Sequence, residues 1–230
     1  MTTVRRSVEK TVSRLVRRTL RERARQAGLP GARPDATLAL ATLIDQGLDA
    51  TPATLGPLCA SALDQGIGCL IVPLDQIAAC ADLLAGSGCR VGALVAGTAE
   101  LDQALDAGAS EVELVPPAAA LEHEADLAAW VATIRGRGDS SFVFKLNLAA
   151  LELSSDALLR VCAQATSLPI DYLTIPAGLV AAVQRTLNPD MGIKVAGIAT
   201  LEAARQALSA GASRLGTTVG PILLDQARMG

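Results

Sequence analysis

The feature that most constrains the fold is a regular alternation of short apolar runs with longer stretches rich in Ala and Leu. The short runs predict strands, and they are Leu38–Asp45, Cys69–Pro73, Arg90–Val95, Glu111–Pro116, Phe142–Leu148, Tyr172–Pro176, Gly192–Gly197 and Arg214–Thr218. The longer stretches have the amphipathic pattern of helices and include Asp75–Leu84, Ala99–Ala107, Ala125–Ile134, Asp156–Ala165 and Leu201–Ala210. A strand followed by a helix, repeated eight times in 230 residues, predicts an α/β fold of the (β/α)8, or TIM-barrel, type. An open doubly wound sheet would use fewer strands and a Gly-rich first turn, and no such turn follows any of these runs.

The first 28 residues differ in charge from the rest of the chain. Residues 1–25 hold eight Arg, one Lys and two Glu, a net charge of +7, whereas the whole chain carries −3, so residues 26–230 carry −10. Apolar residues recur at helical spacing in this segment, at Val4, Val8, Val12, Leu15, Val16 and Leu20. We therefore predict a basic amphipathic helix over residues 1–28, a Gly- and Pro-rich linker over 29–37, and the barrel over 38–230.

Three interpretations of this basic helix remain open. It packs on the barrel, on a neighbouring subunit or on a protein partner; it tethers the protein to nucleic acid or an anionic membrane; or it is a targeting-like segment. An exposed stripe of valines and leucines would be a sticky patch, and its arginines face an acidic body. We therefore expect an ordered helix that contacts protein, in a homo-oligomer rather than a monomer.

Composition excludes several classes of function. Aromatic residues make up 2% of the chain, which leaves little for stacking on single-stranded nucleic acid. A single histidine, His123, argues against a zinc site built from histidines and against a Ser-His-Asp hydrolase. The five cysteines form no C-x-x-C pair and have apolar neighbours, as expected of reduced thiols in a cytoplasmic protein. The pattern predicts no metal, no cofactor and no membrane span.

Two lysines inside predicted strands are the best candidates for chemistry. The interior of a (β/α)8 barrel is otherwise aliphatic, and its active sites lie at the carboxyl ends of the strands. The chain has only three lysines, and two of them, Lys145 and Lys194, lie in strands. An ammonium is costly to bury unless it is paired or its pKa falls, and lysine, unlike arginine, can lose its proton.

Two carboxylates complete the predicted site. Glu113 lies in the strand Glu-Val-Glu-Leu-Val, and Asp45 closes the first strand. With Lys145 and Lys194 they provide the groups needed for proton transfer or Schiff-base chemistry. Two ammonium groups close together are also expected to lower each other's pKa, which would make one amine a nucleophile. A buried ion-pair network with a purely structural role is the alternative interpretation.

Five segments, taken in order over about residues 38–224, carry a resemblance to a known family. They are Ile-Asp-Gln-Gly-Leu-Asp-Ala-Thr-Pro-Ala-Thr-Leu (44–55), Ser-Glu-Val-Glu-Leu-Val (110–115), Phe-Lys-Leu (144–146), Gly-Ile-Lys-Val-Ala-Gly-Ile (192–198) and Gly-Ala-Ser-Arg-Leu-Gly-Thr-Thr (211–218). In this series the chain resembles the deoxyribose-phosphate aldolases, which are class I aldolases. The resemblance places Glu113 on the family's catalytic aspartate, Lys145 on its fifth-strand lysine and Lys194 on the second lysine of its active pair.

The chain departs from this family at the residue that forms the Schiff base. The family's sixth strand reads Asp-Phe-Ile-Lys-Thr-Ser-Thr-Gly, whereas residues 171–178 read Asp-Tyr-Leu-Thr-Ile-Pro-Ala-Gly. Thr174 therefore stands at the lysine position and cannot form an imine. The Asp-His-Thr of the family's first strand is Asp45-Gln46-Gly47, and its second-strand cysteine falls on Leu70.

A second departure concerns the family's phosphate site. The Gly-Gly pair after the seventh strand is Gly197-Ile198, which places a bulky side chain beside backbone donors. Thr217 and Thr218 keep hydroxyl groups at the other half of that site. We therefore predict Thr174, Gly197, Thr217 and Thr218 as substrate-binding positions, and we do not expect ordinary cleavage of deoxyribose phosphate.

Three functional hypotheses follow. In the first, Lys194 is the amine of an aldol or retro-aldol reaction on a small carbonyl or sugar-like substrate with little or no phosphate, and Lys145 and Glu113 move protons. In the second, Glu113, Asp45 and the lysines catalyse proton transfer, elimination or cyclisation without an imine. In the third, the barrel has lost catalysis and acts as a scaffold, and its basic helix binds a partner.

Overall fold

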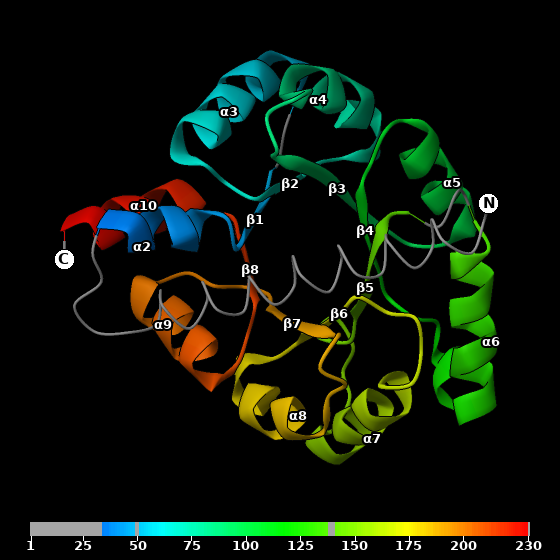
Figure 1. Ribbon diagram of the computed structural model, residues 1–230. Helices are drawn as coiled ribbons and strands as arrows, with labels where there is room; N and C mark the ends of the chain where they lie inside the picture. Colours follow the sequence, from blue (N-terminus) through cyan, green and yellow to red (C-terminus); the bar gives the residue numbers. More distant parts are fainter. Residues whose placement is uncertain (1–33, 49–50, 138–140, 230) are drawn as a thin grey trace, which may run out of the picture.

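A computed structural model describes residues 34–48, 51–137 and 141–229. Eight parallel strands close into a barrel in chain order, with β8 beside β1 (Figure 1). The strands are β1 Ile44–Gly47, β2 Cys69–Ile71, β3 Arg90–Val95, β4 Glu111–Leu114, β5 Val143–Asn147, β6 Tyr172–Ile175, β7 Gly192–Val195 and β8 Arg214–Thr217. The predicted (β/α)8 barrel is therefore confirmed.

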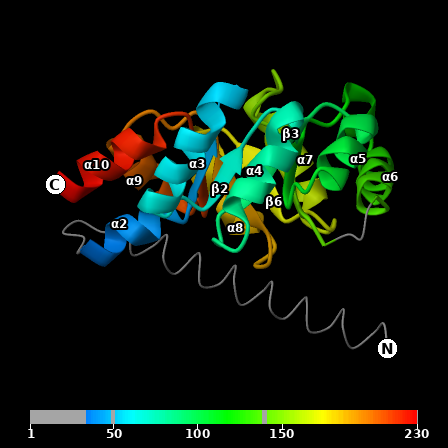
Figure 2. The same cartoon turned by 90° about the horizontal axis from the view of Figure 1, so that it is seen from above.

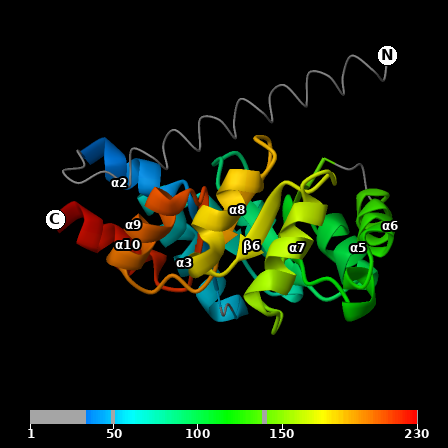
Figure 3. The ribbon, with the colours of Figure 1, turned by 90° about the horizontal axis from the view of Figure 1, so that it is seen from below.

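The helices form the outer layer and surround the strands (Figure 1), and they cover the sides of the barrel in the views from above and from below (Figures 2 and 3). They are α2 Pro34–Ala41, α3 Pro52–Gln65, α4 Ile77–Leu84, α5 Thr98–Asp106, α6 Glu124–Arg135, α7 Ser155–Ala165, α8 Val180–Thr186, α9 Leu201–Ala210 and α10 Gly220–Met229. Short 3-10 turns precede three of them, at Leu74–Gln76, Ala118–Leu121 and Ala177–Leu179. No helix in the described ranges is long and apolar enough to cross a membrane.

Local sequence signals explain where several helices begin and end. Ser154 and Thr200 cap α7 and α9, because their side-chain oxygens accept the backbone N–H groups of Ala157 and Ala203. Helix α9 ends at Gly211, whose φ of 115° lies in the left-handed region that glycine adopts without strain.

The start of the barrel differs from the sequence prediction. The run Leu38–Asp45 was expected to be a strand and residues 29–37 a linker, but α2 occupies Pro34–Ala41 and the strand begins at Ile44. Pro34 is the first residue of α2, where the missing N–H of proline costs nothing. A continuous apolar run suits a buried helix as well as a strand, so periodicity alone does not separate them. The predicted helix over residues 1–28 lies outside the described residues.

The remaining seven strands match their predicted ranges within two residues at each end. Their register places Glu113 beside Lys145, and Lys194 between Thr174 on one side and Arg214 on the other. Gly192 pairs with Tyr172, and glycine is needed there because a Cβ atom would lie 2.3 Å from the Tyr172 ring.

Candidate active site

Four charged side chains meet inside the barrel. Asp45, Glu111, Lys145 and Arg214 come from β1, β4, β5 and β8, and each is at most 1% exposed. Lys145 Nζ contacts Asp45 Oδ2 and lies 2.5 Å from Glu111 Oε2. Arg214 donates from its two terminal nitrogens to Asp45 Oδ1 and Glu111 Oε1, each at 2.7 Å. Opposite charges therefore compensate each other throughout this buried network, as burial of ions requires.

Two further residues hold this network in place. Arg90 Nε lies 2.5 Å from Glu111 Oε1 at the edge of the cluster. The Arg214 guanidinium lies over the Tyr172 ring, 5.5 Å from its centroid, which is within the range of a cation–π interaction. Arg214 is therefore fixed by two carboxylates and a ring at once.

The network sets the ionisation of its members. Burial alone would raise the pKa of Asp45, but Arg214, Lys145 and Lys194 together hold that pKa well below its usual range. Burial likewise opposes ionisation of Glu111, and Arg214 and Lys145 nevertheless lower its pKa to about 2. Burial would lower the pKa of Lys145, but Asp45 and Glu111 raise it above its usual value. Lys145 therefore stays an ammonium, which contradicts the expected lowering of its pKa by the second lysine.

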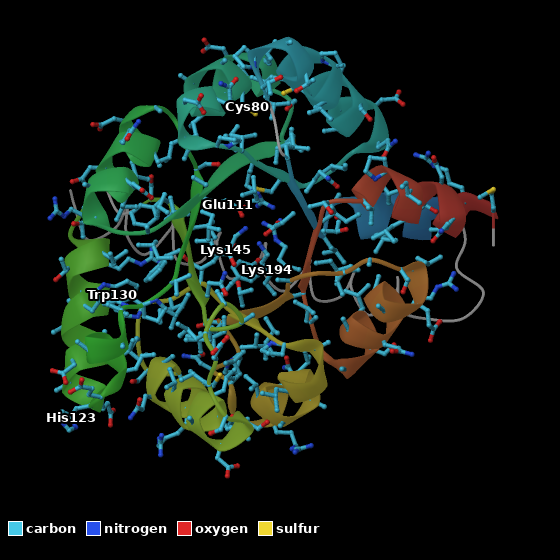
Figure 4. The ribbon with its side chains drawn as sticks, turned by 180° about the vertical axis from the view of Figure 1, so that it is seen from behind. Cys80, Glu111, His123, Trp130, Lys145 and Lys194 are labelled. Carbon is cyan, nitrogen blue, oxygen red and sulfur yellow. The ribbon has the colours of Figure 1, made fainter. Side chains whose placement is uncertain are left out.

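Lys194 lies at the boundary between this network and a pocket. Its Nζ donates to Glu113 Oε2 at 2.6 Å and lies 3.1 Å from Asp45 Oδ2. Lys194 and Glu113 are each 4% exposed, whereas Lys145 is fully buried. In Figure 4 the Lys145 and Lys194 side chains lie near the barrel axis with Glu111, and His123 lies at the outer rim.

The pocket has a volume of about 310 Å³ and opens at the end of the barrel where the strands finish. Its polar side is formed by Lys194, Glu113, Asp45, Asn147, Thr217 and Thr218. Of the two lysines in the described part of the chain, Lys194 lines the pocket and Lys145 does not. The amine of Lys194 and the carboxylate of Glu113 are therefore the adjacent acid–base pair that a ligand in this pocket meets.

The structure brings together most of the predicted site residues. Gly197, Thr217 and Thr218 line the pocket with the lysine and its carboxylates. Thr174 does not line it: this side chain is fully buried beside Lys194, and its hydroxyl has no hydrogen-bond partner among the described residues. The Thr217 hydroxyl donates to the Ile198 carbonyl at 2.5 Å and accepts from the Val219 N–H at 3.0 Å, so its hydrogen bonds are internal.

Sequence reasoning missed Glu111 and Arg214, which complete the buried network. The sequence does contain evidence for both, because each is a charged residue inside an otherwise apolar strand, as the two lysines are. Asn147 was also missed; it lines the pocket and its side-chain oxygen accepts the Ala150 N–H at 3.1 Å. Gln46 was noted only as a departure from a family pattern, yet its Oε1 accepts the Gly220 N–H at 2.7 Å.

Asp45, Cys69 and Glu111 have ligand atoms close enough together to hold a metal ion. All four carboxylate oxygens of this group, however, already contact Lys145, Arg214 or another cation of the cluster. Burial also raises the pKa of the Cys69 thiol well above its usual value, which opposes the thiolate that metals bind. These residues therefore fit an internal ion-pair network better than a metal centre.

The fold and the site define a (β/α)8 barrel protein with a lysine and carboxylates at the mouth of the barrel. No family model matches the chain. The chain is 27% identical to a deoxyribose-phosphate aldolase of Geobacillus sp. (strain WCH70) over 215 residues, which cover 81% of this chain and 95% of that protein. It is 28% identical to the deoxyribose-phosphate aldolase of Methanothermobacter thermautotrophicus over 211 residues, covering 81% and 94%.

A solved structure gives the same result for the fold. The deoxyribose phosphate aldolase of Aeropyrum pernix, described as a tetramer, superposes with a TM-score of 0.74 at 21% identity, covering 90% of this chain and 97% of that one. The predicted resemblance to the deoxyribose-phosphate aldolases is therefore confirmed. The relatives are aldolases, which are carbon–carbon lyases, and this supports an aldolase-like lyase function for the chain.

Proposed function

We propose that the protein is an aldolase-like lyase in which Lys194 forms an imine with a small carbonyl substrate. The observation that carries this proposal is the position of the Lys194 amine, which lines an open pocket and lies 2.6 Å from the Glu113 carboxylate. An amine nucleophile needs an adjacent base that removes its proton, and Glu113 is placed to do so. An open pocket also favours an enzyme over a scaffold, whose barrel mouth would be filled by aliphatic side chains.

The proposed reaction balances with these two groups. Lys194 gives a proton to Glu113 and attacks the carbonyl carbon; the carbonyl oxygen leaves as water, and a C=N bond remains on Nζ. Glu113 returns its proton to Nζ to give an iminium ion and then removes a proton from the neighbouring carbon, which gives an enamine. In the aldol direction the enamine carbon attacks a second aldehyde, whose oxygen takes this proton from Glu113. In the retro-aldol direction Glu113 removes the proton of the substrate hydroxyl, the carbon–carbon bond breaks to release an aldehyde and leave the same enamine, and Glu113 then protonates the enamine carbon. Hydrolysis of the iminium ion returns the lysine.

Lys145 has a different role in this proposal from the one expected of it. It is fully buried outside the pocket lining and its pKa is raised, so it is poorly suited to exchange protons with a substrate. It is a positioning residue that holds Asp45 and Glu111 charged, and Asp45 in turn contacts Lys194. Lys145 thus acts on Lys194 through a shared carboxylate.

A second candidate function is proton transfer without an imine. Lys194 contacts two carboxylates, Glu113 and Asp45, so its Nζ is already held between two hydrogen-bond acceptors. In that case Lys194 would act as a proton donor to an oxygen of the substrate, and Glu113 as the base that removes a proton from carbon. The two candidates differ in whether a covalent adduct forms.

Borohydride trapping separates them. Borohydride reduces an imine to a stable secondary amine, so incubation with acetaldehyde and borohydride should add one ethyl group to one lysine. The chain has three lysines, Lys10, Lys145 and Lys194, so peptide mass mapping assigns the adduct without ambiguity. We expect it on Lys194, and we expect Lys194→Arg to abolish it, because arginine keeps the charge but does not lose its proton.

The control is an unfolding curve of Lys194→Arg, which should match that of the native protein because the ion pairs with Glu113 and Asp45 are kept. An adduct that maps only to Lys10 would contradict the proposed site. A folded protein that turns over a carbonyl substrate without any trapped adduct would favour proton transfer. We also propose that the chain assembles with copies of itself, as the Aeropyrum pernix relative does.

A further inference from the structure

The pocket has an apolar wall opposite its lysine. Leu94 on β3 is 56% exposed although it lies within a barrel strand, and it lines the pocket. It is the register partner of Glu113, so it stands beside the proposed catalytic carboxylate. Ile71 on β2 continues this wall, whereas Ile198 and Val219 follow β7 and β8 and line the pocket on the side of Lys194. An exposed leucine inside a pocket is an apolar contact left open for a ligand.

Several hydrogen-bond donors at and behind the threonine end of the pocket already have partners within the protein. Behind the lining, Gln46 Oε1 accepts the Gly220 N–H at the start of α10, at 2.7 Å. The Thr217 hydroxyl bridges the Ile198 carbonyl and the Val219 N–H, and the Ile198 N–H donates to the Gly216 carbonyl at 2.9 Å. These donors are therefore already used, and a doubly charged phosphate group could bind them only by breaking such bonds.

The charges of the lining agree with this. In the described part of the chain, Lys194 is the cation that lines the pocket, and Asp45 and Glu113 line it as anions. Lys194 is already paired with both of these carboxylates. A phosphate group would compete with them for the one cation that the described residues bring to the pocket, whereas an uncharged substrate would leave the pairs in place.

We infer that the pocket selects an unphosphorylated aldehyde or ketone that carries a short apolar chain, with Leu94 as its specificity-determining residue. This inference rests on the proposed imine at Lys194. The carbonyl carbon meets the amine beside Glu113, and the chain extends along Leu94 and Ile71. A volume of about 310 Å³ is at the small end of ligand pockets, which suits a substrate of a few carbons.

Trapping with a series of carbonyl compounds tests the inference. Acetaldehyde, butanal, glycolaldehyde and glyceraldehyde 3-phosphate are each titrated against the protein with borohydride present. For each compound we determine the concentration that gives half of the maximal adduct. The same titration with free butylamine corrects for the intrinsic reactivity of the compound. Each methylene buried against the wall should tighten binding about fourfold. Butanal should therefore bind more tightly than acetaldehyde, and glyceraldehyde 3-phosphate should bind least well.

Two variants assign the effect to the wall. Leu94→Ser should reduce the preference for butanal over acetaldehyde by about fourfold or more, because it replaces the apolar contact with a hydroxyl. Leu83→Ser is the matched control: Leu83 is 50% exposed on α4 and does not line the pocket, so this change should leave the series unaltered. An unchanged series in Leu94→Ser would overturn the role of Leu94.

Calorimetric titration with butyramide, an unreactive amide of the same length, distinguishes failure of the inference from failure of the proposed imine. An adduct that forms best with glyceraldehyde 3-phosphate would overturn the inference and leave the imine standing. Butyramide binding that Leu94→Ser weakens, without any adduct, would support the apolar wall and overturn the imine. Absence of both adduct and butyramide binding would overturn both.

Discussion

Removal of the Lys145 ammonium tests whether the buried network stabilises the barrel as its geometry indicates. Lys145→Met keeps most of the side-chain volume, so the change is mainly electrostatic. Asp45 and Glu111 would lose one cation each while remaining buried, although Arg214 still contacts both. Breaking a buried pair from one side costs about 3–5 kcal/mol, and because the Arg214 guanidinium remains we expect this variant to lose ~3 kcal/mol.

The assay is guanidinium chloride unfolding at neutral pH, compared with a matched exposed pair. Arg137 Nη1 lies 2.7 Å from Asp102 Oδ2, but both side chains are more than 40% exposed, whereas the side chains of Lys145 and Glu111 are fully buried. Arg137→Met should therefore cost less than about 1 kcal/mol. If Lys145→Met lost no more free energy of unfolding than Arg137→Met, burial would not determine how much an ion pair contributes to stability here, and the reasoning would be refuted.

Three further outcomes follow. The folded-state pKa of Glu111 is about 2, below its usual 4.5, so Glu111 binds a proton in the unfolded chain first as the pH falls. The free energy of unfolding should therefore be highest above about pH 4.5 and should decline toward pH 2. Unfolding curves that do not change over this range would contradict this expectation. Thr174→Lys adds a third amine, next to Lys194. We expect this variant to be less stable in denaturant and to gain weak retro-aldol activity on unphosphorylated 2-deoxy sugars. Failure to trap an imine at position 174 would count against the alignment of β6. Deletion of residues 1–28 should change the oligomeric mass in light scattering or expose a dye-binding apolar surface, whereas unchanged mass and stability with loss of lipid or nucleic-acid binding would favour a tether.

The sequence predicted the barrel well where strands and helices have different periodicities. Arg90–Val95 and Leu201–Ala210 have the predicted bounds, because each is a clear strand or amphipathic helix between turn residues. The prediction was wrong over Leu38–Ala41, where an unbroken apolar run does not distinguish a buried helix from a buried strand. Pro34 was interpreted as part of a linker, although proline is equally well accommodated in the first turn of a helix.

The site was predicted less completely because charge pairing across a barrel depends on register. Lys145, Lys194 and Asp45 were found from their rarity or their place in a strand. Their partners were not, since Arg214 looks like any of the 17 arginines until β8 is placed beside β1. The specificity of the pocket was also hidden, because nothing in the local sequence distinguishes Leu94 from a core leucine. Only the closed barrel shows that this side chain is exposed.

The ion pair between Asp45 and Arg214 has a consequence for how the chain folds as it is made. The two residues are 169 positions apart, and they join the first strand to the last. A nascent chain that ends before β8 has two open strand edges and a carboxylate without its guanidinium, so it gains neither closure nor charge compensation. We therefore expect the barrel to reach its native state only after β8 has left the ribosome. Until then the apolar strands stay exposed, and the chain is prone to aggregate.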